Sequence, residues 1–268
     1  MEILKKIINE HLEYRKQILK LAKVGFKREN SNSLLGGLWN IVRPIIIILV
    51  YWFTFSIGLR SGGDVNEQPF LLWLLVGIIP WFYISEMLVK GGKALISNKH
   101  LITKMKFPLS IIATFTNITH FFTHLMLVGV IFIMYFIFKV PLTIYVLQLP
   151  IYIILTFTFL NLWSFFISIL VVFSKDLLQL IKSLITALFW LSGIIFNINN
   201  IDIPLIKLIL DINPITFLVT GYRNCFLNQV WFFEQPKQLL VFLIILVILA
   251  LLGLQSFRKL RKEIPDVL

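Results

Sequence analysis

The sequence is poor in cysteine and in acids. Cys225 is the only cysteine among 268 residues, which excludes a disulfide within the chain, and we expect it to be a packed free thiol. The chain has 13 Asp and Glu against 25 Lys and Arg. Glu86, Asp176 and Asp211 are far apart in the sequence, so no pair of carboxylates indicates general acid–base catalysis.

Motifs for nucleotide and metal chemistry are missing as well. The phosphate-binding loop GxxxxGK[ST] does not occur, and Gly91-Gly92-Lys93 has neither its spacing nor a preceding strand. GxSxG, CxxC and zinc-binding spacings are also absent. We therefore expect a chain that is not an enzyme by itself and that binds no cofactor of its own.

Long apolar stretches are what the sequence has in abundance. Hydrophobic residues make up 58% of the chain and the mean hydropathy is +0.89, which excludes an ordinary soluble domain. A helix needs about 20 apolar residues to cross a hydrocarbon core. We predict a single all-α integral membrane domain over residues 1–268 with six transmembrane helices, at 38–59, 70–89, 108–138, 142–173, 177–196 and 239–254.

The basic residues are grouped. Of the 25, eight precede residue 30, five lie between 90 and 106, one is Lys175 and four lie between 258 and 262. The positive-inside rule places these groups and both termini on the cytoplasmic side, so the net charge of +12 needs no nucleic-acid partner. Residues 1–30 combine charge with helical apolar spacing. This pattern indicates an amphipathic helix in the membrane interface rather than a signal peptide, with a solvated helical tail as the alternative.

Two predicted spans, the first and the fifth, carry a polar face. Seven side chains at helical spacing define these faces: Asn40, Arg43, Tyr51, Thr54, Lys182, Thr186 and Trp190. Because polar faces avoid lipid, we predict that they line a pore. Arg43 is equally suited to reach out to the inner interface.

The remaining polar groups of the spans are interpreted as packing groups. Glu86 has Lys90 four residues further on, which predicts an ion pair within one helix. His120 and His124 have the spacing of two metal ligands, but no third ligand accompanies them in the sequence. We predict a polar seam between helices here and no metal site.

Residues 90–107 form a basic loop without acids, and they contain apolar residues at near-helical spacing. The loop either sets membrane topology alone or is a handle for a soluble partner. The residues that would contact the partner are Lys90, Lys93, Leu95, Lys99, His100, Leu101, Lys104 and Lys106.

Residues 197–237 contain two apolar segments, 203–211 and 214–228, and each is too short to cross alone. If the second crossed, the basic tail at 258–262 would lie outside, against the positive-inside rule. We therefore predict two re-entrant half-helices that form a hairpin at an outer pore mouth.

Several blocks of the sequence match one family. PFLLWLLVGIIPWFYISE and KMKFPLSII, together with residues 33–62 and 213–227, resemble the permease subunits of polysaccharide-exporting ABC transporters. Within this group the chain looks most like teichoic-acid translocation permeases, and O-antigen exporter permeases are the neighbouring possibility. The resemblance covers most of the chain.

The resemblance implies the following assembly. Two copies form a pore in the cytoplasmic membrane, and two separate ATP-binding subunits, which hold ATP and magnesium, dock at the 90–107 coupling loop. The substrate is an undecaprenyl-diphosphate-linked polymer. The outer gate comprises Asn213, Pro214, Tyr222 and Arg223, the last two within reach of substrate phosphates.

Three other functions predict different sequence features. A channel or ion-coupled transporter predicts inverted repeats and buried acids, and neither is visible. A membrane-embedded transferase needs a catalytic cluster near one interface, whereas the acids are scattered. An exporter of a drug or small lipid would share the fold, and only the long blocks that resemble polysaccharide exporters argue against it.

Overall fold

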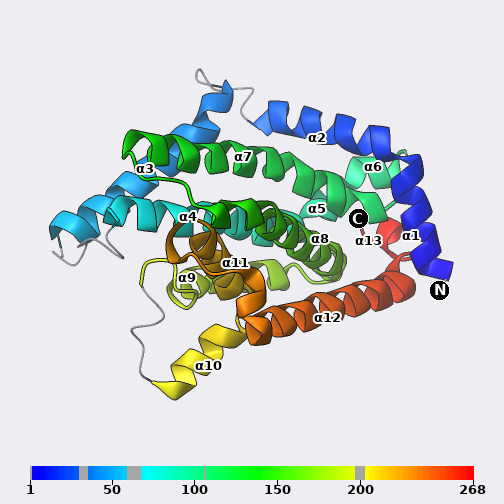
Figure 1. Cartoon of the computed structure of the whole chain (residues 1–268). Coiled ribbons are helices and arrows are strands. Elements are labelled where there is room, and N and C mark those ends of the chain that lie inside the picture. Colours follow the sequence, from blue (N-terminus) through cyan, green and yellow to red (C-terminus); the bar gives the residue numbers. More distant parts are fainter. Residues whose placement is uncertain (1, 30–35, 59–67, 106, 197–202) are drawn as a thin grey trace.

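The computed structural model describes residues 2–29, 36–58, 68–105, 107–196 and 203–268, which form helices and connecting turns without a β-sheet (Figure 1). Lys106 and residues 197–202, part of the predicted hairpin, lie outside the described residues. The all-α fold predicted from the hydropathy is therefore confirmed for the described ranges.

Among the described residues, five helices are long and apolar enough to cross a membrane, and the bent pair of short helices at Pro204–Ile212 and Pro214–Asn228 would make a sixth if it counts as one span. The five are α3 (Trp39–Phe53, extended by a π-helical turn at Thr54–Gly58), α4 (Phe70–Gly92), α7 (Ser110–Ile137), α8 (Leu149–Phe173, preceded by a 3-10 turn at Ile144–Gln148) and α12 (Pro236–Leu260). Each of the five overlaps one of the predicted spans, and α4 and α12 run beyond the predicted bounds. The central helix is α4, which packs against α7, α8 and α11.

The fifth predicted span, 177–196, is wrong in its extent. Helix α9 (Asp176–Trp190) has 15 residues, about 22 Å of helix, and residues 191–196 form turns. The reason is local, because Gly193 has a φ of 63°, a left-handed conformation that ends helices and favours glycine. The turn redirects the backbone carbonyls of Gly193 and Ile194 toward another helix.

The two short helices predicted after this turn are confirmed. Helices α10 (Pro204–Ile212) and α11 (Pro214–Arg223) are bent by 85° relative to each other, and a π-helical turn at Asn224–Asn228 extends α11. Asn213 caps α11 by accepting a hydrogen bond from the backbone N–H of Ile215 at 2.9 Å. Helix α11 is buried along most of its length, whereas α10 is exposed.

The chain termini and the basic loop meet at one end of the molecule (Figure 1). The predicted N-terminal helix is two helices, α1 (Glu2–Glu13) and α2 (Arg15–Glu29), and the basic loop contains α5 (Ala94–Ser97) and α6 (Lys99–Thr103). The last helix is α13 (Ile264–Val267). One apolar cluster joins these elements, and we call it the terminal cluster. Its buried members include Ile18, Ala22, Leu95, Leu101, Ile102, Ile111, Phe115, Phe257 and Ile264.

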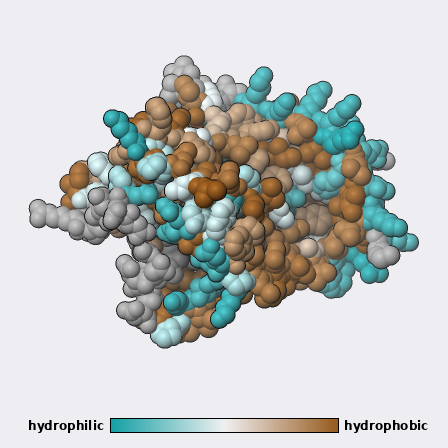
Figure 2. Space-filling model, in the orientation of Figure 1, coloured by the Kyte–Doolittle hydropathy of each residue, from teal (hydrophilic) through white to brown (hydrophobic). Residues whose placement is uncertain are grey.

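The surface follows the same division. Figure 2 shows hydrophilic residues gathered at the end that holds the termini, next to a broad hydrophobic band. Burial differs sharply between helices within this band, since 78% of the apolar window of α4 is buried and only 6% of that of α3. Ile48 is the one buried residue among those described in α3, and the others are half-buried or exposed in the single chain.

Candidate functional site

A polar cavity of about 340 Å³ lies between α3, α4, α7 and α9. We call it the charged pocket. Its polar lining includes Asn40, Arg43, Tyr83, Glu86, His120 and His124. The first two of these residues come from the predicted polar face of α3, so the structure brings part of that face against the core of the bundle.

Four ionisable groups from three helices meet beside this pocket. The Lys90 ammonium pairs with the Glu86 carboxylate at 2.8 Å, as predicted, and also with Glu29 on α2. His120 Nδ1 lies 3.6 Å from one oxygen of each carboxylate. Glu29, Glu86 and His120 have the donor types of a cation site, with ligand atoms within 4.8 Å of one another, and Lys90 already supplies a positive charge there.

His124 belongs to a different group from His120. Its Nε2 lies 2.8 Å from the Tyr222 hydroxyl, and its ring stacks on Tyr83 with centroids 4.8 Å apart. Tyr83 in turn donates to Asn117 Oδ1 at 2.5 Å. His124 thus forms part of a buried polar seam between α4, α7 and α11, as expected from the sequence, while His120 faces the carboxylates.

The two predicted polar faces lie on neighbouring helices. Tyr51 of α3 stacks on Phe189 of α9 with ring centroids 5.4 Å apart. Arg43, Thr54, Lys182, Thr186 and Trp190 are exposed in the single chain, and Asn40 and Tyr51 are half-buried. The pore-lining role of these residues stays a prediction, and their exposure is what a lining shared with another copy requires.

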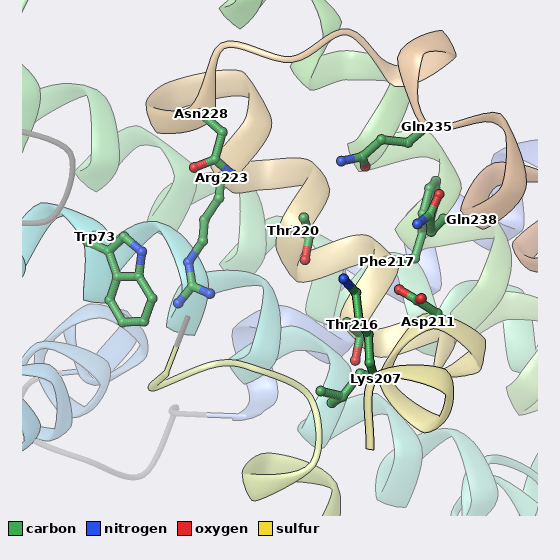
Figure 3. A pocket seen from close by; sticks show the side chains of 11 residues that line it. Trp73, Lys207, Asp211, Thr216, Phe217, Thr220, Arg223, Asn228, Gln235 and Gln238 are labelled. Atoms are coloured by element: carbon green, nitrogen blue, oxygen red, sulfur yellow. The ribbon is translucent and has the colours of Figure 1, made fainter. Parts of the chain in front are cut away.

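A second polar cavity, of about 240 Å³, lies at the end of α4 away from the termini (Figure 3). We call it the amide pocket. It is enclosed by α4, α10, α11 and the start of α12. Its lining comprises Trp73, Lys207, Leu210, Asp211, Thr216, Phe217, Thr220, Arg223, Asn228, Gln235 and Gln238.

Arg223, at the edge of this pocket, is held by the protein itself. It is 4% exposed, and its guanidinium donates to the backbone carbonyls of Gly193 and Ile194 at 2.5 Å each. The guanidinium carbon lies 3.7 Å from the centroid of the Trp73 ring, a cation–π contact. Gly77 leaves room for it, because a Cβ there would come 2.4 Å from Nη2.

The predicted outer-gate residues therefore have other contacts than substrate. Tyr222 is fully buried against His124, and Arg223 ties α11 to α4 and to the turn after α9. Asn213 caps α11 and donates to the Leu191 carbonyl and the Ser192 hydroxyl, and Pro214 opens α11. The expected reach of Tyr222 and Arg223 toward substrate phosphates stays a prediction. Tyr222 is buried in the single chain, and Arg223 is held by two backbone carbonyls although it lines the amide pocket.

Apart from Arg223, sequence reasoning missed the residues that line the amide pocket. Thr216, Thr220 and Arg223 follow one another at i, i+4 and i+7 along α11, a polar stripe that helical spacing reveals. Gln235 and Gln238 come from the start of α12, and only the tertiary fold brings them to the same cavity.

Buried leucines hold the basic loop against the terminal cluster. Leu95 and Leu101 are 2% and 7% exposed in the terminal cluster, so they hold the loop in place and are not free to contact a partner. Lys90 and Lys93 are half-buried. Of the predicted coupling residues that the structure describes, Lys99, His100 and Lys104 are exposed.

Long apolar helices, two polar cavities at different depths and a braced basic loop define a membrane permease. The comparison with known families is specific, because residues 16–227 match the ABC-2 type transporter family, and the chain belongs to this family. Its long apolar helices are accordingly those of the membrane part of an ABC transporter.

Relatives narrow the class further. The chain is 24% identical over 222 residues to the O-antigen export system permease protein RfbA of Myxococcus xanthus, with 82% of this chain and 84% of that protein covered. It is 25% identical over 205 residues to a protein of the same name from Klebsiella pneumoniae, with 76% and 77% covered. The resemblance to exporter permeases is confirmed at the level of the family, and these relatives carry O-antigen names rather than teichoic-acid ones.

Proposed function

We propose that the chain is the permease subunit of an ATP-driven exporter that moves a lipid-linked polysaccharide of O-antigen type across the cytoplasmic membrane. The observation that carries this proposal is the match to the ABC-2 family together with similarity to O-antigen export permeases over 76% to 82% of the chain. Teichoic acid, a phosphate-rich polymer, is the second candidate, since the sequence blocks around α4 resemble its permeases.

Two copies are needed to complete a pore. The polar faces of α3 and α9 are exposed side by side, which is unfavourable in lipid and favourable when a second copy and water cover them. A two-fold symmetric pair presents the same face to itself. A cysteine placed at Thr54, on the exposed face of α3, should cross-link two copies. The background reaction should be low, because the native Cys225 is fully buried. Failure to cross-link along the whole exposed face of α3 would contradict this arrangement.

Two ATP-binding subunits, which hold ATP and magnesium, dock at the basic loop. Lys99 and Lys104 offer exposed positive charge beside His100 and Met105, and Leu95 and Leu101 fix the loop to the terminal cluster. The loop continues directly from α4, a helix of 23 residues and about 34 Å. A push on the loop therefore reaches the amide pocket through α4, because Trp73 near the other end of α4 is bound to Arg223. With the ATP-binding subunits at the loop, both termini lie on the cytoplasmic side and the amide pocket lies on the outer side.

The test is mass spectrometry of what co-purifies with the chain from its native membrane in mild detergent. An ATP-binding subunit at one-to-one stoichiometry with a lipid-linked glycan low in phosphate supports the proposal. The same subunit with a phosphate-rich polymer supports the teichoic-acid candidate. An intact complex without any ATP-binding subunit contradicts both and favours a channel.

A further inference from the structure

We propose that the amide pocket binds one uncharged sugar unit of the exported polymer. This inference rests on the proposed function and adds a location and a ligand class to it. The cavity is about 240 Å³, below the roughly 300 Å³ at which pockets for drug-sized ligands begin. Its size suits a single sugar ring rather than a longer piece of chain.

An unsatisfied hydroxyl points to a ligand with hydrogen-bonding groups. Thr216 is 5% exposed and lines the pocket, and its Oγ1 has no hydrogen-bond partner among the described residues. Leaving a buried hydroxyl unpaired is unfavourable, and native proteins rarely do so without cause. Figure 3 shows Thr216, Asp211 and Lys207 among the side chains that line the pocket. Because Oγ1 is itself buried, the hydroxyl of a bound sugar supplies the missing partner once the Thr216 side chain rotates toward the pocket.

Three amide side chains are linked by hydrogen bonds, and the two at the ends keep free groups that a ligand can contact. Asn228 Nδ2 donates to Asn224 Oδ1 at 2.9 Å, and Asn224 Nδ2 donates to Gln235 Oε1 at 3.1 Å. These two bonds leave the Asn228 carbonyl as an acceptor and the Gln235 amide hydrogens as donors at the pocket. A sugar hydroxyl both donates and accepts, so one ligand class satisfies both of these groups.

The charges of the pocket argue against a phosphate. Two nitrogens of the Arg223 guanidinium are occupied by the carbonyls of Gly193 and Ile194, its Nε has no hydrogen-bond partner among the described residues, and the only other cation in the lining is the exposed Lys207. Asp211, one turn further along α10, brings a carboxylate to the same wall. A phosphate site gathers several cationic or backbone N–H donors and avoids carboxylates. The apolar parts of the lining, Leu210 and Phe217, suit the apolar face of a sugar ring.

The experiment is saturation-transfer NMR on the full chain in lipid nanodiscs, with the methyl glycosides of mannose, galactose and N-acetylglucosamine and with glycerol 3-phosphate as probes. We expect a saturable signal from at least one glycoside and none from glycerol 3-phosphate. Thr216→Val, which keeps shape and removes the hydroxyl, should weaken binding about fivefold, the value of one hydrogen bond. Gln238→Ala changes a half-buried residue that α12 contributes to the pocket, and it should also weaken binding.

Thr116→Val is the matched control. The Thr116 hydroxyl donates to the Ile112 carbonyl in its own helix and does not line the pocket, so glycoside binding should be unchanged. The inference is overturned if no glycoside saturates, if glycerol 3-phosphate binds instead, or if Thr216→Val and Gln238→Ala bind as the native chain does. Cell-surface polysaccharide is measured in parallel in a strain that lacks the chain. Export that depends on the chain without glycoside binding rejects only this inference, whereas export without the chain rejects the proposed function.

Discussion

The charged pocket and the amide pocket both lie against α4, but their polar groups are satisfied in different ways. Beside the charged pocket, Lys90 of α4 pairs with both Glu86 of the same helix and Glu29 of α2. In the amide pocket the one buried charge, Arg223, donates to two backbone carbonyls. The ion pairs therefore hold α2 against α4, whereas Arg223 ties α11 to the turn after α9. Both pockets keep buried polar atoms without a hydrogen-bond partner among the described residues: Nδ1 of His120 and His124 at the first, and Thr216 Oγ1 and Arg223 Nε at the second.

The largest effect is expected from Arg223→Ala. The change leaves the Gly193 and Ile194 carbonyls without their donor and removes the contact with Trp73. We expect a loss of about 2–4 kcal/mol of unfolding free energy, measured as a lower thermal midpoint in detergent. Arg223→Lys should restore little, because an ammonium does not reproduce the two-pronged guanidinium. An unchanged midpoint with export abolished would instead mean that Arg223 acts on the substrate.

Gly77→Ala tests the same tie from the side of α4. The added Cβ would lie 2.4 Å from Arg223 Nη2, so the guanidinium has to leave its carbonyls or strain the helix pair. We expect about 1–3 kcal/mol of destabilisation, the usual range for overpacking. Gly129→Ala on α7 is the matched control, because no heavy atom lies within 4 Å of its added Cβ, and helix propensity favours alanine. Equal midpoints for the two variants would contradict the close contact.

The features that could be predicted from the sequence are those set by residues close together in the chain, and the features that could not are those set by how the helices dock. The break between α10 and α11 was predictable because Asn213 and Pro214 are local cap signals. The Glu86–Lys90 pair was predictable because both lie on one helix. The convergence of Glu29 and His120 on that pair was not, since it depends on how α2 and α7 dock. Arg223 looked like an exposed gate residue because nothing local indicates that the turn at Gly193 would cover it.

A smaller effect is expected at the charged pocket, from Lys90→Met. The change leaves the Glu29 and Glu86 carboxylates without a shared cation, but both side chains are partly exposed, so solvent screens much of the repulsion. We expect about 1 kcal/mol of destabilisation and faster tryptic cleavage within α2. Glu29→Gln should cost less in the Lys90→Met background than alone, because the two residues interact directly. Lys259→Met, at an exposed lysine, is the control. If the effects of Lys90→Met and Glu29→Gln simply add, Lys90 does not hold α2.

The smallest effect, and the sharpest contrast, comes from two buried threonines. Thr119 donates to the carbonyls of Phe115 and Ala22 at 2.9 Å and 3.3 Å, whereas Thr216 has no partner among the described residues. Thr119→Val should therefore cost about 1 kcal/mol, and Thr216→Val should change the midpoint by less than about half of that or raise it. Equal losses would mean that the Thr216 hydroxyl is already satisfied within the protein. If Thr216→Val is as stable as the native chain, the Thr216 hydroxyl does not stabilise the isolated chain. It is then available for a contact with a ligand in the amide pocket.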